Sequence, residues 1–171
     1  MLHWRRFVVA AAGTLSLLVT GASSAAADEG GTLIRFDSMT PITGAAVGAV
    51  NDRGLAGGGL PWMITSGRGS VDHRGNLDVT VHGLVLAAGA NTGKNPIGSF
   101  AATLSCLTPH GVVNVTTGLF PASMTGDSTI DTTIAVPHPC KSPEVFVGAV
   151  LGGQFRWFAV SNVREDDEDG D

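Results

Sequence analysis

The sequence has 171 residues, of which 43% are hydrophobic and 15% are charged, and its formal net charge is −5. Nine acidic and eight basic residues lie at positions 28–164. All six remaining acidic residues lie at positions 165–171, which contain no basic residue. The near-neutral body has no basic patch, which excludes binding to nucleic acid or to an anionic membrane by charge attraction.

The N-terminal segment is predicted to be a secretory signal peptide, residues 1–27. Two arginines precede an apolar run at residues 7–19, and an A-x-A site at Ala25 and Ala27 places cleavage before Asp28. The apolar run is shorter than the ~20 residues that a membrane-spanning helix needs. The adjacent Arg5 and Arg6 leave twin-arginine export open beside the general secretory route.

The rest of the chain is predicted to be all-β. Glycine and proline interrupt every long window, and β-branched residues dominate the apolar runs. A first strand is expected at residues 32–38, a turn at 39–44 and a short second strand at 45–50. A glycine-rich loop at residues 51–62 follows, with the sequence NDRGLAGGGLPW.

A long hairpin is predicted next, with arms at residues 64–72 and 76–86 and a turn at 73–75. In the second arm, apolar and polar residues alternate. This alternation predicts one buried face and one solvent-exposed face. The apolar positions are Leu77, Val79 and Val81, and the polar ones are Asp78, Thr80 and His82.

The C-terminal half continues with period-two strands at 99–106, 112–117 and 128–136, then a Pro-rich crossing at 137–143. A closing hairpin is expected at 144–150 and 154–163. Eight or nine strands at this spacing predict an antiparallel β-sandwich of the Ig-like or Greek-key type, with a β-barrel as the alternative. One domain is expected at residues 28–164, followed by a disordered acidic tail at 165–171.

The two cysteines, Cys106 and Cys140, are predicted to form a disulfide. An exported protein meets oxidising conditions, and an even number of cysteines indicates that they pair with each other. The alternative is a zinc site, in which His110 and His138 would join the two sulfurs to give a four-ligand set.

The loop at 51–62 is the predicted contact surface for a ligand or partner, because loops carry function on rigid sandwiches. This hypothesis needs Trp62 to be half exposed. In the alternative, the glycines allow a tight crossover and Trp62 plugs the end of the sandwich. The candidate contact residues are Asn51, Arg53, Gly57, Gly58, Gly59 and Trp62.

No catalytic residue, metal or cofactor is predicted. The sequence has neither a G-x-S-x-G elbow nor an H-E-x-x-H motif, and GANTGK at residues 89–94 is one residue too short for a phosphate loop. His73 and His82 have no triad partner nearby in sequence, so we expect them to be solvated.

Several stretches together resemble an uncharacterised family of small secreted bacterial β-sandwich proteins. They are GGGLPW, GRGSVDHRGNLDVTVHGLVL, FAATLSC, VVNVTTGLFPA, GDSTIDTTIAVPHPC and VFVGA. The resemblance implies a fold and export, but no activity. The rhythm of the hairpin at residues 67–84 is also similar to chordin-type (CHRD) β-sandwich domains, although the His-rich segment of those domains is absent here.

The expected function is that of a secreted, non-catalytic binding or structural module, extracellular or associated with the cell wall. Its partner would be a protein or a surface polymer, and self-association through exposed strand edges is a further expectation. The mature chain is expected to have no membrane span. The alternative function is that of a secreted hydrolase with a dispersed active site.

Overall fold

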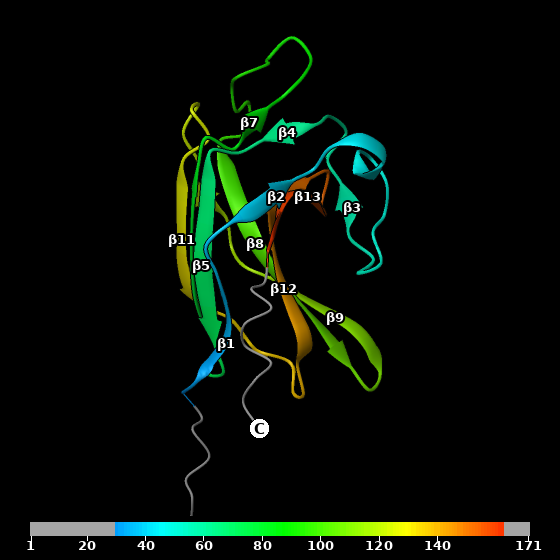
Figure 1. Cartoon of the computed structure of the whole chain (residues 1–171), viewed down its shortest axis with the longest axis vertical. Helices are drawn as coiled ribbons and strands as arrows, with labels where there is room; N and C mark the ends of the chain where they lie inside the picture. The colour runs from blue at the N-terminus through cyan, green and yellow to red at the C-terminus, as the bar shows by residue number, and fades with distance from the viewer. Residues whose placement is uncertain (1–29, 163–171) are drawn as a thin grey trace, which may run out of the picture.

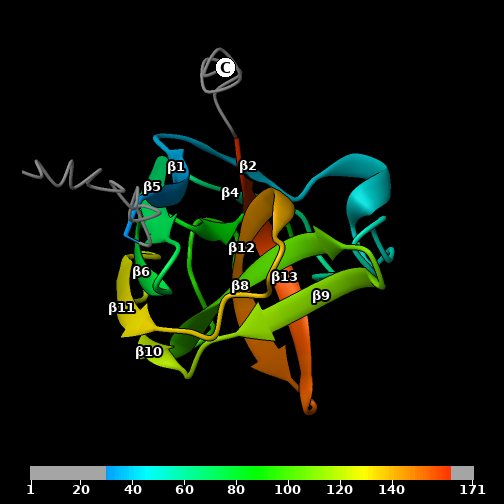
Figure 2. The same ribbon diagram turned by 90° about the horizontal axis from the view of Figure 1, so that it is seen from below.

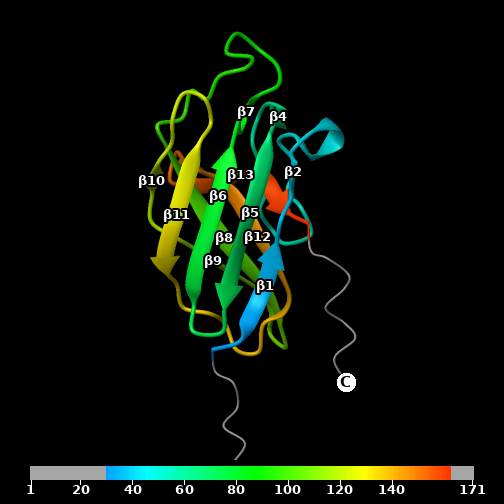
Figure 3. The ribbon, with the colours of Figure 1, turned by 60° about the vertical axis from the view of Figure 1, so that its left-hand side comes forward.

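The computed structural model describes residues 30–162, which form two main β-sheets packed against each other. Figure 1 shows the layers from the side, and Figure 3 places the four-stranded sheet in front of the other. Each strand of the four-stranded sheet runs antiparallel to its neighbours. Its order is β1 (Thr32–Phe36), β5 (Ser66–Asp72), β6 (Asn76–His82) and β11 (Ser128–Thr133).

The second sheet is seven-stranded and lies to the right of the first in the view from below (Figure 2). Its main order is β10 (Phe120–Pro121), β8 (Ser99–Thr108), β12 (Lys141–Leu151), β13 (Gln154–Ser161) and β2 (Met39–Pro41). Outside this order, β9 (Gly111–Thr116) pairs with β8, and β3 (Ala56–Gly57) pairs with β13. A two-stranded sheet of β4 (Trp62–Met63) and β7 (Val85–Leu86) lies at one end.

The predicted all-β sandwich is confirmed. All strand pairs are antiparallel except the short parallel pair of β3 and β13, and the main sheets do not close into a barrel, so that alternative is wrong. The described part of the chain contains thirteen strands rather than eight or nine. Several of the additional strands are only two or three residues long, and the sequence pattern does not predict strands this short.

Three local predictions are wrong. Residues 45–50 do not form a strand, because Gly44 (φ 55°) and Gly48 (φ 72°) adopt left-handed conformations that turn the chain. The 3-10 helix η1 (Gly44–Ala46) begins at the first of these glycines. The expected turn at 39–44 begins instead with strand β2. The arm at 76–86 is also interrupted, because Gly83 (φ 64°) separates β6 from β7.

The core lies between the two main sheets. Val71, Leu77, Val79 and Val81 point inward from the four-stranded sheet, and Phe100, Leu104, Val145 and Val147 are fully buried in the second sheet. Asp78 and His82 are exposed, which confirms the predicted division of β6 into a buried and a solvent-exposed face. Trp157, Phe158 and Ala159 are consecutive and buried, so β13 is covered on both faces as its sequence predicts.

Candidate functional site

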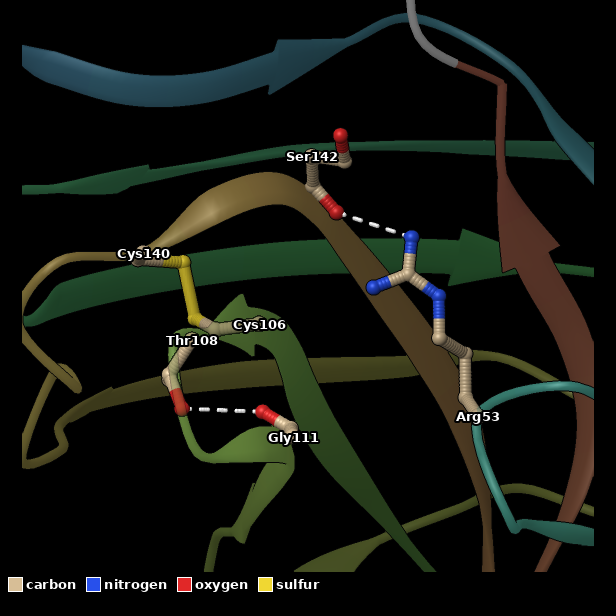
Figure 4. The surroundings of a disulfide bond; sticks show 6 residues. All are labelled: Arg53, Cys106, Thr108, Gly111, Cys140 and Ser142. Carbon is tan, nitrogen blue, oxygen red and sulfur yellow. Dashed lines mark hydrogen bonds between the residues drawn. A yellow bond between two sulfur atoms is a disulfide. The ribbon is translucent and has the colours of Figure 1, made fainter.

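The predicted disulfide is present and joins the end of β8 to the segment that enters β12. The Cys106 and Cys140 sulfurs lie 2.02 Å apart, and Cys106 is fully buried (Figure 4). The alternative zinc site is wrong, because both sulfurs are bonded to each other. His110 and His138 are exposed, and among residues 30–162 no group of three or more His, Cys, Asp or Glu could hold a metal ion.

Arg53 fastens the predicted contact loop to the second sheet. Its side chain is only 6% exposed, and its Nη2 donates to the Ser142 carbonyl at 2.9 Å (Figure 4). The same Nη2 lies 3.1 Å from Glu144 Oε1. The side-chain amide of Asn114 on β9 donates to the Arg53 carbonyl at 2.9 Å. Asn51 Oδ1 shapes the loop by accepting from the backbone N–H of Arg53 and Leu55. Arg53 is therefore a buried structural contact.

The loop's glycines and tryptophan are also packed into the fold. A Cβ on Gly57 would overlap the Ile42 side chain, and one on Gly58 would lie 2.9 Å from the Phe158 ring. Trp62 is 3% exposed and stacks on Phe158, with ring centroids 4.0 Å apart. The expectation of a half-exposed Trp62 is wrong, and its packing matches the alternative in which Trp62 plugs the end of the sandwich. Of the candidate contact residues only Gly59 is exposed.

A polar cluster that the sequence did not reveal lies where β6 ends. Asp127 Oδ1 is 3.3 Å from His82 Nδ1 and accepts from the Gly83 N–H, while Asp127 Oδ2 accepts from the hydroxyls of Thr125 (2.6 Å) and Ser123 (3.1 Å). His82 and Asp127 are 45 residues apart, so no local spacing links them. The only sequence signal is the alternation of Ser123, Thr125 and Asp127 on one short loop.

The cluster contains serine, histidine and aspartate, but it is not arranged as a catalytic triad. In a triad the histidine bridges the carboxylate and the nucleophile. Here the Ser123 hydroxyl and His82 both contact the Asp127 carboxylate, so the imidazole is not placed to take the serine proton. The contacts hold the loop at 123–127 against the end of β6. The Thr125 hydroxyl, with the Gly83 N–H, the Ser123 hydroxyl and His82, keeps the pKa of Asp127 below its ordinary value, against a smaller opposing effect of burial.

We expect Asp127→Ala to lower the free energy of unfolding by about 1–2 kcal/mol at neutral pH, because a carboxylate with several donors is lost from a half-exposed site. Because the pKa of Asp127 is lower in the folded state than its ordinary 3.8, the carboxylate stabilises the fold above about pH 4, and this contribution disappears as the pH falls through the folded-state pKa. Urea unfolding at several pH values measures the difference. A difference that stays constant down to the lowest pH would contradict this account.

The outer surface of the four-stranded sheet presents a charged side chain on each of its four strands. We define the polar face as Arg35 on β1, Arg68 on β5, Asp78 on β6 and Asp131 on β11. Asp78 and Asp131 are direct cross-strand partners, so their carboxylates lie on the same face. Within residues 30–162 none of these four side chains has a hydrogen-bond or ion-pair partner. Shallow depressions between these side chains are lined by Ser70, Asp72 and Asn76, among others.

Comparison with known proteins gives no relative for this chain. It matches no protein-family model, no curated protein and no solved structure. In the region that the structure describes, no helix has the length and apolar character needed to cross a membrane.

Proposed function

We propose that this chain is an exported, non-catalytic binding protein, extracellular or associated with the cell wall, that contacts its partner through the polar face. The observation that carries the proposal is the set of four charges on one sheet surface that have no partner within residues 30–162. Like charges directly opposite each other across two strands destabilise a sheet. The Asp78–Asp131 pair therefore has a cost that a bound cationic group on a partner would offset.

The chemistry of the polar face defines the partner. Arginines lie on the β1 and β5 side and aspartates on the β6 and β11 side, so the face presents both charges side by side. None of these four strands carries a Phe, Tyr or Trp other than the buried Phe36, so stacking of these large rings on sugars is not the mode of contact. A protein segment or a surface polymer with both cationic and anionic groups fits this pattern.

Export is supported by the predicted leader together with the disulfide. Disulfides persist in oxidising compartments outside the cytosol, and Cys106–Cys140 is fully formed here. The signal peptide itself lies outside the described residues. Expression of the full-length sequence in a bacterium, followed by N-terminal sequencing of the protein recovered from the medium, tests this step. A mature N-terminus at Asp28 is expected, and an unprocessed protein retained in the cytosol would contradict it.

The binding step is tested by sedimentation of the purified protein with washed cell envelopes. We expect saturable retention that falls at least about tenfold in Asp78→Ala/Asp131→Ala and in Arg35→Ala/Arg68→Ala, as expected for the loss of two charge contacts. Thr80→Ala/Thr129→Ala is the matched control, because it changes two uncharged cross-strand partners on the same sheet surface. Equal retention of all variants would overturn the assignment of the polar face.

The alternative function is that of a hydrolase, and the one observation in its favour is the His82–Asp127 pair. Such an enzyme would lose its activity in His82→Ala. We expect instead that His82→Ala binds envelopes like the unmodified protein and that neither form hydrolyses ester or glycoside substrates. Hydrolysis that depends on His82 would replace the binding proposal.

A further inference from the structure

Among the described residues, the outer edge of β9 is an unpaired row of backbone groups. Within residues 30–162 β9 pairs with β8 and with no other strand, and the β8–β9 hairpin projects away from the four-stranded sheet (Figure 1). Its residues are exposed except for the partly buried Val115, and Val112 and Val113 are each 38% exposed. Such an edge is a template for pairing with another strand.

The pairing pattern shows which residues direct their backbone groups outward. The Thr117 N–H donates to the Ala102 carbonyl at 2.9 Å, and the Ala102 N–H donates to the Thr117 hydroxyl at 3.1 Å, so these two residues occupy a hydrogen-bonded position of the ladder. Hydrogen-bonded and non-hydrogen-bonded pairs alternate along an antiparallel ladder. The register Thr103↔Thr116 and Ser105↔Asn114 therefore consists of non-hydrogen-bonded pairs. Val112, Asn114 and Thr116 consequently present their N–H and C=O groups to the free side of β9.

The other strands at sheet borders carry features that discourage edge-to-edge pairing. β2 and β10 contain Pro41 and Pro121, β11 carries Asp131, and β1 has both Arg35 and a register shift between Thr32 and Ile34. The strands β3, β4 and β7 are only two residues long, too short to offer an extended edge. Proline, charge and bulges are the devices that natural edges use against aggregation. β9, with the sequence GVVNVT, has no charge, no proline and no register shift.

We propose that β9 pairs antiparallel with β9 of a second copy of this chain, across a two-fold axis at Asn114. In this register the residues with outward backbone groups lie opposite each other in the two copies, Asn114 opposite Asn114 and Val112 opposite Thr116. On the core-facing surface of the sheet, Val113 of each copy lies opposite Val115 of the other, which gives two valine pairs. A closed two-fold interface uses the same surface on both partners. The homodimer joins the two seven-stranded sheets into one continuous sheet.

The self-complementarity of β9 favours a second copy over an unrelated peptide. An uncharged strand meets itself with no like-charge contact, and this register leaves no outward N–H or C=O of residues 112–116 unpaired. Asn114 keeps its side-chain bond to the Arg53 carbonyl, because that bond lies on one surface of the sheet and the edge pairing uses the backbone only. This inference is independent of the polar face, which belongs to the other sheet.

The test compares two variants that change the same two positions. Val112→Lys/Thr116→Lys places lysine opposite lysine at both ends of the proposed pairing, whereas Val112→Lys/Thr116→Asp places lysine opposite aspartate. Both lose the contact between the Thr116 and Thr103 hydroxyls equally, so effects on folding are matched. The proteins are expressed from the full-length sequence, and each is purified as the cells process it, with or without the N-terminal segment. Sedimentation equilibrium over a wide concentration range then gives the dissociation constants.

We expect the unmodified protein and the Lys/Asp variant to be dimers, with a dissociation constant for the Lys/Lys variant at least about tenfold higher than for the Lys/Asp variant. Val150→Lys, which changes an exposed residue near the β12–β13 turn, is expected to dimerise like the unmodified protein. A monomeric unmodified protein at all concentrations overturns the proposal. A dimer of equal strength in the Lys/Lys and Lys/Asp variants overturns it as well, because the interface then lies elsewhere.

Discussion

Trp62→Ala is expected to lower the free energy of unfolding by about 3–5 kcal/mol, the range for large aromatic residues removed from a core. Trp62 is stacked on Phe158 and meets the edge of Phe100 at 6.3 Å between ring centroids. Its removal leaves a cavity where β4 closes the end of the sandwich. Because domains have a total stability of about 5–15 kcal/mol, the variant should unfold at much lower denaturant concentration. Equilibrium unfolding in urea, followed by circular dichroism, measures the change.

Leu60→Ala is the matched control, since Leu60 lies two residues away and is 43% exposed. Its effect should stay within about 0.5 kcal/mol, as for most surface substitutions. A Trp62→Ala protein as stable as the Leu60→Ala protein, but unable to bind cell envelopes, would contradict the structural role. That outcome would restore the loop at 51–62 as the contact surface.

Removal of the disulfide by Cys106→Ala/Cys140→Ala is expected to destabilise the protein by about 3.8 kcal/mol, the loop-entropy value for a separation of 34 residues. The bond joins β8 to the chain that enters β12, the two strands at the centre of the second sheet. Alanine is preferred to serine at position 106 because the site is fully buried and a hydroxyl there would need a partner. Urea unfolding of the variant and of the unmodified protein gives the difference.

Chemical reduction of the unmodified protein is the control, and it should reproduce the destabilisation of the double variant. A loss below about 1 kcal/mol would show that β8 and β12 hold this corner without the bond. Two titratable thiols in the denatured, unreduced protein would contradict the disulfide itself.

The two proposed surfaces belong to different sheets. The polar face lies on the four-stranded sheet, and β9 is at the border of the seven-stranded sheet. A β9-mediated homodimer would therefore leave both polar faces uncovered, and each dimer would present two of them. Two linked binding surfaces increase retention on a repeated surface polymer, because the second contact forms at a high effective concentration.

The buried and solvent-exposed faces of β6 could be predicted because they follow from residues that are neighbours in sequence. Leu77, Val79 and Val81 alternate with polar residues, and a strand necessarily directs alternate side chains to opposite faces. The disulfide was predictable for a different reason, since two cysteines allow only one intramolecular pair. The all-β class could be predicted because glycine and proline interrupt every long window and β-branched residues dominate the apolar runs.

The tertiary structure decided every feature that joins residues distant in sequence. Arg53 is buried because Ser142 and Glu144, about 90 residues away, supply its partners, and His82 meets Asp127 only through the pairing of β6 with β11. Local patterns describe the period of one strand, but they contain no information on which strands become neighbours. The burial of Trp62, the polar face and the free edge of β9 therefore became visible only with the order of strands in the two sheets.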